Sequence, residues 1–227
     1  HLLPPPAKVI GKVYPKVQPN LAVYNTNTTT TSTSSATTNS VTTTLTDSKL
    51  TSFLLRSYAK STQFCLTSLA TCALLTTLDL EGCVGLNDTA LLKIANTNIT
   101  HYNLNNCTKL TASGLVAFLN ANSIRNKFIS VLRCNKVEVS DEVLVCVGAQ
   151  CNALTALSLK LCKTYTDAGF SALAQCTQLS ELYVQMNDNI TDDSIQALSE
   201  QCTKLHTLHL INCAKLTDAT LTHIATL

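Results

Sequence analysis

One pattern of apolar residues and cysteine recurs six times along this chain. It has the form L-x-x-L-x-L-x-x-C and is clearest in "LHTLHLINC" at residues 205–213. Successive copies end 24, 27, 28, 25 and 26 residues apart, at Cys83, Cys107, Cys134, Cys162, Asn187 and Cys213. An apolar motif with a period in the twenties predicts a solenoid, in which one structural unit stacks on the next.

A helix-start signal follows each copy. Its first residue has a short side-chain oxygen that can cap exposed N–H groups, and an aspartate usually comes next. The pairs are Asn87-Asp88, Thr111-Ala112, Ser140-Asp141, Thr166-Asp167, Thr191-Asp192 and Thr217-Asp218. Apolar residues then recur at helical spacing. The sequence therefore predicts an α/β leucine-rich repeat solenoid, an arc with parallel strands on its concave side and helices on its convex side.

A second set of cysteines links the chain to a known family. Several predicted helices end at a cysteine three residues before the next copy, at Cys72, Cys151, Cys176 and Cys202. With these, residues 72–227 resemble the cysteine-containing leucine-rich repeat family, whose repeat is C-x-x-L-x-x-L-x-L-x-x-C-x-x-L-T-D. That family includes F-box substrate receptors and relatives without an F-box. The resemblance implies a six-repeat domain that binds other proteins, and one such solenoid serves many partners.

The chain divides into three predicted regions. Residues 1–46 form an extended tail, first rich in proline and lysine and then rich in threonine and serine, because all five prolines precede residue 20 and no acidic residue precedes Asp47. Residues 47–71 are expected to form a helical N-terminal cap over the first repeat. They lack the Leu-Pro opening that often begins an F-box. Residues 72–227 hold the six repeats.

The tail cannot form a core of its own, so we expect a partner to supply the surface that it buries. The stretch "KVIGKVYPKV" at residues 8–17 offers both apolar and cationic side chains. The lysines suit an acidic rim on a protein, or the phosphates of a ribonucleoprotein. The alternative is that the tail folds back on its own solenoid. The predicted partner-binding residues of the tail are Lys8, Val9, Ile10, Lys12, Val13, Tyr14, Lys16 and Val17.

The 11 cysteines favour buried free thiols in a reducing compartment. No close C-x-x-C pair is present, so no metal site is expected. Disulfides between stacked repeats, and hence secretion, are the alternative, because the chain also carries N-glycosylation sequons. The Ser/Thr-rich, acid-free leader leaves the mitochondrion and the cytosol both open. Cys83, Cys107, Cys134, Cys162 and Cys213 are predicted to be buried and reduced, in the turn after each strand.

The sequence gives little support for catalysis. The five histidines lie at positions 1, 101, 206, 209 and 223, and none belongs to a nucleophile–base arrangement that departs from the repeat. Phosphate-binding glycine motifs are missing as well. The interpretation is a non-enzyme without cofactor or small-molecule substrate, and no apolar run approaches the ~18 residues of a membrane span.

The outward side chains of the predicted strands form the candidate binding surface, because strand residues alternate between core and surface. This surface combines acidic, apolar and aromatic side chains, which suits a protein partner better than a polyanion. The net charge of +2 also gives little support for nucleic-acid binding outside the tail. The candidate residues are Asp79, Glu81, His101, Asn103, Phe128, Leu132, Lys160, Glu181, Tyr183, Gln185 and His209.

Together these features predict a non-enzymatic protein–protein interaction scaffold. We expect it to be a structural subunit of a larger assembly, anchored by its N-terminal tail to other protein subunits. The alternative that the family resemblance implies is the substrate-recognition part of a ubiquitin ligase whose F-box is missing from this chain.

Overall fold

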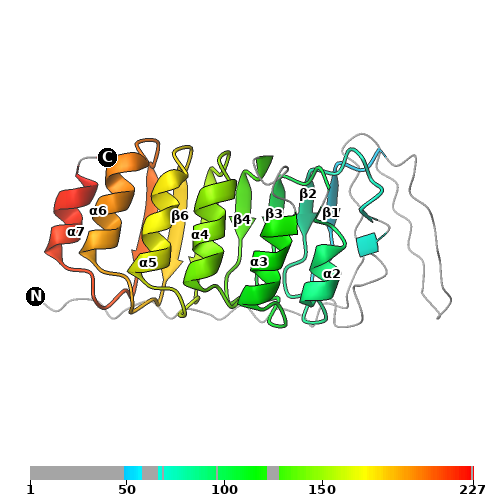
Figure 1. The fold of residues 1–227 in the computed structure, drawn as a ribbon, viewed down its shortest axis with the longest axis horizontal. Coiled ribbons are helices and arrows are strands. Elements are labelled where there is room, and N and C mark those ends of the chain that lie inside the picture. Colours follow the sequence, from blue (N-terminus) through cyan, green and yellow to red (C-terminus); the bar gives the residue numbers. More distant parts are fainter. Residues whose placement is uncertain (1–48, 58–65, 68, 96, 122–127, 226) are drawn as a thin grey trace, which may run out of the picture.

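Strand, turn and helix alternate along the chain and build one parallel sheet with helices packed along one side (Figure 1). The computed structural model describes residues 49–57, 66–67, 69–95, 97–121, 128–225 and 227. Seven strands in these ranges pair in chain order: β1 (Ser52–Leu54), β2 (Thr77–Asp79), β3 (His101–Asn103), β4 (Val131–Arg133), β5 (Ala156–Lys160), β6 (Glu181–Gln185) and β7 (Thr207–Ile211). This is the predicted leucine-rich repeat solenoid.

The helices follow the strands as the capping signals predicted. They are α2 (Asp88–Leu92), α3 (Ala112–Ala121), α4 (Asp141–Gln150), α5 (Asp167–Phe170) with the 3-10 helix η2 (Ser171–Gln175), α6 (Asp192–Gln201) and α7 (Asp218–Ile224). Asn87, Thr166 and Thr217 are N-cap residues whose side chains accept a backbone N–H of the first turn.

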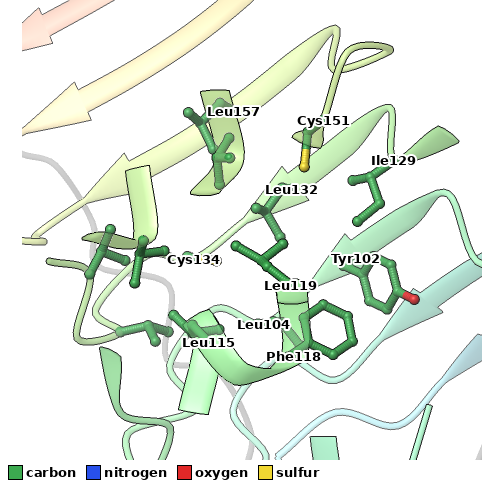
Figure 2. Packing of buried hydrophobic residues seen from close by; sticks show 14 of the residues in the cluster. Tyr102, Leu104, Leu115, Phe118, Leu119, Ile129, Leu132, Cys134, Cys151 and Leu157 are labelled. Carbon is green, nitrogen blue, oxygen red and sulfur yellow. The ribbon is translucent and has the colours of Figure 1, made fainter. Parts of the chain in front are cut away.

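The hydrophobic core lies between the sheet and the helices. Each strand from β2 to β7 directs at least one residue into it, and these residues are in register across the sheet: Leu78, Tyr102, Leu132, Leu157, Leu182 and Leu208. Figure 2 shows Leu132 beside Leu119 of α3, and Tyr102 beside Phe118. The rings of Tyr102 and Phe118 meet edge to face, with centroids 5.4 Å apart. Each repeat therefore buries its apolar residues against its neighbours.

Residues 49–57, within the range that the sequence predicted to form a helical cap, contain a strand instead. Strand β1 lies within them and pairs with β2, and in the described part of residues 47–71 helical backbone is found only at residues 66–67 and 69. The reason is that Leu50, Phe53 and Leu55 repeat the L-x-x-L-x-L spacing and are all buried. The repeat array thus begins before residue 72. The predicted tail, residues 1–46, lies outside the described residues.

Cysteines of the turn after each strand make hydrogen bonds between repeats. Each Sγ donates to a backbone carbonyl of the preceding repeat: Cys83 to Leu55 at 2.8 Å, Cys107 to Leu80 at 3.1 Å, and Cys162 to Cys134 at 3.0 Å. Asn187 replaces the cysteine in the next repeat, and its Nδ2 donates to the carbonyl oxygens of Cys162 and Tyr165, each at 3.2 Å. These side chains add hydrogen bonds to carbonyl groups of the turns, two of which, those of Leu80 and Cys134, also accept a backbone N–H.

Two of the five cysteine predictions need correction. Cys134 is buried, as predicted, but it occupies the place of the third leucine in its repeat, and Val137 lies at the turn position. Cys213 is half-buried because it belongs to the last described repeat, on which no further repeat stacks in the structure. Cys83, Cys107 and Cys162 are buried in the turn as predicted.

Aspartates of successive helix starts connect each repeat to the next. Asp88 accepts the backbone N–H of Thr111 at 3.0 Å and its hydroxyl at 2.7 Å. Asp167 binds Thr191 in the same way, with both distances 2.7 Å. The pairs Asp141–Thr166 and Asp192–Thr217 repeat this geometry. We call this series the Asp–Thr ladder. It joins the N-terminal ends of neighbouring helices, where negative charge is favourable.

The Asp–Thr ladder is interrupted between α3 and α4. Ala112 takes the place of the aspartate, so Ser140, the next N-cap residue, has no carboxylate to bind. Its Oγ atom is buried and has no hydrogen-bond partner among the described residues. The interruption leaves one polar atom unsatisfied, which normally lowers stability.

Gly114 is predicted to be required by the ladder. A Cβ atom at this position would lie 1.9 Å from Cγ of Asp88. We expect Gly114→Ala to lower the free energy of unfolding by about 1–3 kcal/mol, measured by urea denaturation. Asp88→Ala should lower the free energy of unfolding much less in the Gly114→Ala background than in the wild type, because it removes the group that clashes with the new Cβ atom. Additive effects of the two substitutions would contradict this explanation.

The ladder is also predicted to be sensitive to acid. Hydrogen bonds from the Thr217 side chain and backbone, and from Thr220, lower the pKa of Asp192 to about 2. Stabilisation by the carboxylate is therefore fully present above pH ~4, its unfolded pKa, and is lost as the pH falls toward 2. Asp192→Asn should reduce the urea midpoint at pH 6, and the difference from the wild type should shrink steadily between pH 4 and 2. An unchanged difference over that range would contradict the assignment.

Candidate functional site

The outward side chains of the sheet form one continuous surface, which we call the strand face. It is composed of three rows that cross the strands, because residues in register lie side by side. The first row is Ser52, Thr77, His101, Val131, Ala156, Glu181 and Thr207. The second is Leu54, Asp79, Asn103, Arg133, Ser158, Tyr183 and His209. The third row follows two residues later in each repeat, on or just after the strand, at Arg56, Glu81, Asn105, Asn135, Lys160, Gln185 and Ile211.

Two predicted residues do not belong to the strand face. Leu132 is buried in the core, 5% exposed, and Phe128 is 65% exposed but precedes β4. The predicted copy of the repeat motif that ends at Cys134, with its apolar residues at 129 and 131, was out of register with strand β4. The pattern Ile129, Leu132, Cys134 fits the repeat better and lies three residues later, and a shift by an odd number of residues turns every side chain to the other side of a sheet. Arg133 and Asn135 occupy the outward positions instead.

At the N-terminal end of the strand face, Arg56 forms ion pairs with two carboxylates. Nε of Arg56 donates to Oδ2 of Asp79 at 3.0 Å and lies 3.9 Å from Oε2 of Glu81. The hydrogen bond to Asp79 raises the pKa of Arg56. Nδ2 of Asn103 donates to the same Glu81 oxygen at 3.3 Å. Arg56 is not among the predicted site residues because it lies in the range that was predicted to form a helical cap.

The middle of the strand face has a fixed polar floor. Oδ1 of Asn135 accepts the hydroxyl of Ser158 at 2.8 Å and the backbone N–H of Lys160 at 2.7 Å. The backbone N–H of Asn135 in turn donates to Oδ1 of Asn105 at 2.9 Å. These bonds cross three strands, so the orientation of the asparagine side chains is set before any ligand arrives.

An aromatic cluster lies toward the C-terminal end. Nζ of Lys160 lies 4.9 Å from the ring centroid of Tyr183, a cation–π contact, and the ring of His209 is 4.8 Å away on another side. The Tyr183 hydroxyl donates to Oε2 of Glu181 at 3.0 Å, and this bond raises the pKa of Tyr183. Tyr183 is thus held in place by groups from β5, β6 and β7.

A hollow of about 280 Å³ lies over the polar floor and the aromatic cluster. Its charged and aromatic lining comes from five strands: Arg56, Glu81, Arg133, Lys160, Glu181 and Tyr183. Of the eleven residues predicted for this surface, five line the hollow: Glu81, Asn103, Lys160, Glu181 and Tyr183. Asp79 and Asn103 are almost fully covered, each 7% exposed, and so act mainly by orienting their neighbours. His101 is exposed and Gln185 is half-buried at the margins.

A larger hollow, about 710 Å³, lies at the C-terminal edge and is lined by Leu208, Leu210, Cys213, Leu216, Leu221 and Ile224, among others. Their counterparts in the preceding repeat, such as Leu182, Val184 and Ile195, are fully buried by the next repeat. We therefore assign this hollow to the stacking surface of a repeat, and we take the strand face as the candidate site.

Two other kinds of feature, a metal centre and a membrane-spanning helix, have no counterpart among the described residues. In these ranges, no cluster of three or more His, Cys, Asp or Glu side chains is placed to hold a metal ion. Among the helices of the same ranges, none is both long and apolar enough to cross a lipid bilayer. His101 Nδ1 lies 2.8 Å from the hydroxyl of its neighbour Thr100. The predicted tail residues, 8–17, lie outside the described part.

Comparisons with known proteins support the fold. A family model described as leucine-rich repeat matches residues 71–95 and 175–199. Internalin C2 from Listeria monocytogenes has a similar structure, with a TM-score of 0.57 and 17% identity over 78% of each chain. A second internalin of that bacterium, 12% identical over 78% of this chain and 85% of its own, has a TM-score of only 0.27 and carries no weight. At such identities the likeness concerns the fold alone. The matched repeats and the stacked strand–helix units together show that this chain has the fold of a leucine-rich repeat solenoid.

Proposed function

We propose that this protein is a non-enzymatic interaction scaffold that binds a protein partner on its strand face. Leucine-rich repeat domains are generally protein–protein interaction modules. The observation that carries the proposal is the aromatic cluster, in which Tyr183 is held between Lys160 and His209 beside a preformed hollow. An aromatic side chain fixed in this way offers a large contact area and loses little conformational freedom on binding.

The proposal extends to a role as structural subunit of a larger assembly, with residues 1–46 as its anchor. Its support is the contrast between two kinds of sequence. The repeats bury their own apolar residues, whereas the tail offers Val9, Ile10, Val13 and Tyr14 with lysines between them. A reducing compartment, the cytosol or the mitochondrion, suits the scaffold because Cys83, Cys107 and Cys162 donate hydrogen bonds as protonated thiols. Burial raises the pKa of Cys107 to about 12.

Substitutions on the strand face test the binding role. We expect Tyr183→Ala with His209→Ala to remove the partners that co-purify with the intact protein, while the melting temperature stays within about 2 °C because both side chains are at the surface. Lys93 is an exposed residue at the end of α2, and Lys93→Ala is the matched control. This variant should retain the co-purifying partners. Unchanged partners in the double variant would argue against the strand face as the binding surface.

Deletion of residues 1–46 tests the anchor. We expect the truncated protein to keep its melting temperature and to lose its place in the assembly, which size-exclusion chromatography of the native complex would show. A protein that melts markedly lower and still co-migrates with its partners would instead identify the tail as an intramolecular clamp.

A further inference from the structure

We propose that the hollow on the strand face binds one carboxylate side chain of a partner protein, between Arg133 and Lys160 and beside Tyr183. The inference rests on the proposed function and specifies the chemistry of the peptide segment that this site takes. Four observations carry it: the free charge of Arg133, the position of Lys160, the fixed polar floor, and the small net charge of the lining.

Arg133 is the central cation of the strand face. It is exposed on β4, and its neighbours in register, Asn103 and Ser158, are neutral. Among the described residues no carboxylate forms an ion pair with it, whereas Arg56 binds both Asp79 and Glu81. A guanidinium presents paired N–H donors that match the two oxygens of a carboxylate. Arg133 is therefore available to a partner, and Arg56 is not.

Lys160 provides a second cation at the same hollow. It lies on β5, diagonally across from Arg133, and its Nζ is held 4.9 Å from the Tyr183 ring centroid. The described residues place no carboxylate within ion-pair distance of this Nζ. Tyr183 is itself fixed by Glu181 and His209, so Lys160 has a restricted range of positions. A carboxylate between the two cations would meet donors that are already oriented.

The dimensions and charge of the hollow favour a single acidic side chain. A volume of about 280 Å³ admits one or two side chains, and the floor of Asn105, Asn135 and Ser158 is closed by its own hydrogen bonds. Glu81 and Glu181 line its two margins. They would repel a second anion close to the first, which disfavours a run of phosphates. The structure thus fits an isolated Asp or Glu in a segment otherwise neutral or basic.

A display library of random twelve-residue peptides, selected on the full chain, tests the inference. We expect bound peptides to share one Asp or Glu, and its replacement by Asn or Gln to weaken binding about tenfold or more, the effect typical of a charge-assisted hydrogen bond. Arg133→Gln and Lys160→Ala should weaken the parent peptide similarly and should remove its preference for acid over amide. Lys93→Ala, which removes an equal charge far from the strand face, should bind like the wild type.

Other outcomes separate the inference from the proposed function. Peptides that lose binding with Tyr183→Ala but not with Arg133→Gln, and that share no acid, would overturn the carboxylate site and leave the interaction surface intact. Peptides that bind every strand-face variant equally would overturn both the carboxylate site and the proposed role of the strand face as a binding surface. Tight binding of a phosphoserine form, with no binding of the aspartate form, would overturn the carboxylate assignment in favour of a phosphate ligand.

Discussion

The stacking of each repeat on the next is the constraint on which the rest of this structure depends. A single repeat of this chain is too short to enclose its own leucines, so it is stable only against a neighbour at a fixed distance. Carboxylates such as Asp88 and Asp167 set that distance at the helix ends, and the thiols of Cys83, Cys107 and Cys162 set it inside the turn. The strands that lie between the helix ends and the cysteine turns are in register, and the strand face is continuous.

Much of the fold could be predicted from the spacing of apolar residues, because that spacing is the direct requirement for burying one side of each strand. The incorrect predictions, of the register of β4 and of the region around β1, have local causes. Cys134 resembles the cysteine of the turn, yet it fills a leucine position, and this similarity shifted the predicted register of β4. Strand β1 was missed because Phe53 replaces the second leucine and no cysteine follows at residue 58.

The candidate site was less predictable than the fold. Alternation along a strand identifies outward residues such as Glu181, Tyr183 and His209 once the register is known. It does not show which of them neutralise one another. Arg56 and Asp79 are 23 residues apart in the chain and meet only because two repeats stack. The same is true of Asp88 and Thr111, so the sequence revealed helix caps without revealing that they bind each other.

The interruption at Ala112 has a consequence for how the array opens. On the C-terminal side, Asp141, Asp167 and Asp192 join four consecutive helix starts, whereas the joint between α3 and α4 has no such bond and contains the unsatisfied Ser140 hydroxyl. In a chain of nearest-neighbour units, the weakest junction decides where cooperativity ends. We therefore expect the array to open first between β3 and β4, with amide protons on the two sides of that boundary exchanging with solvent in separate groups.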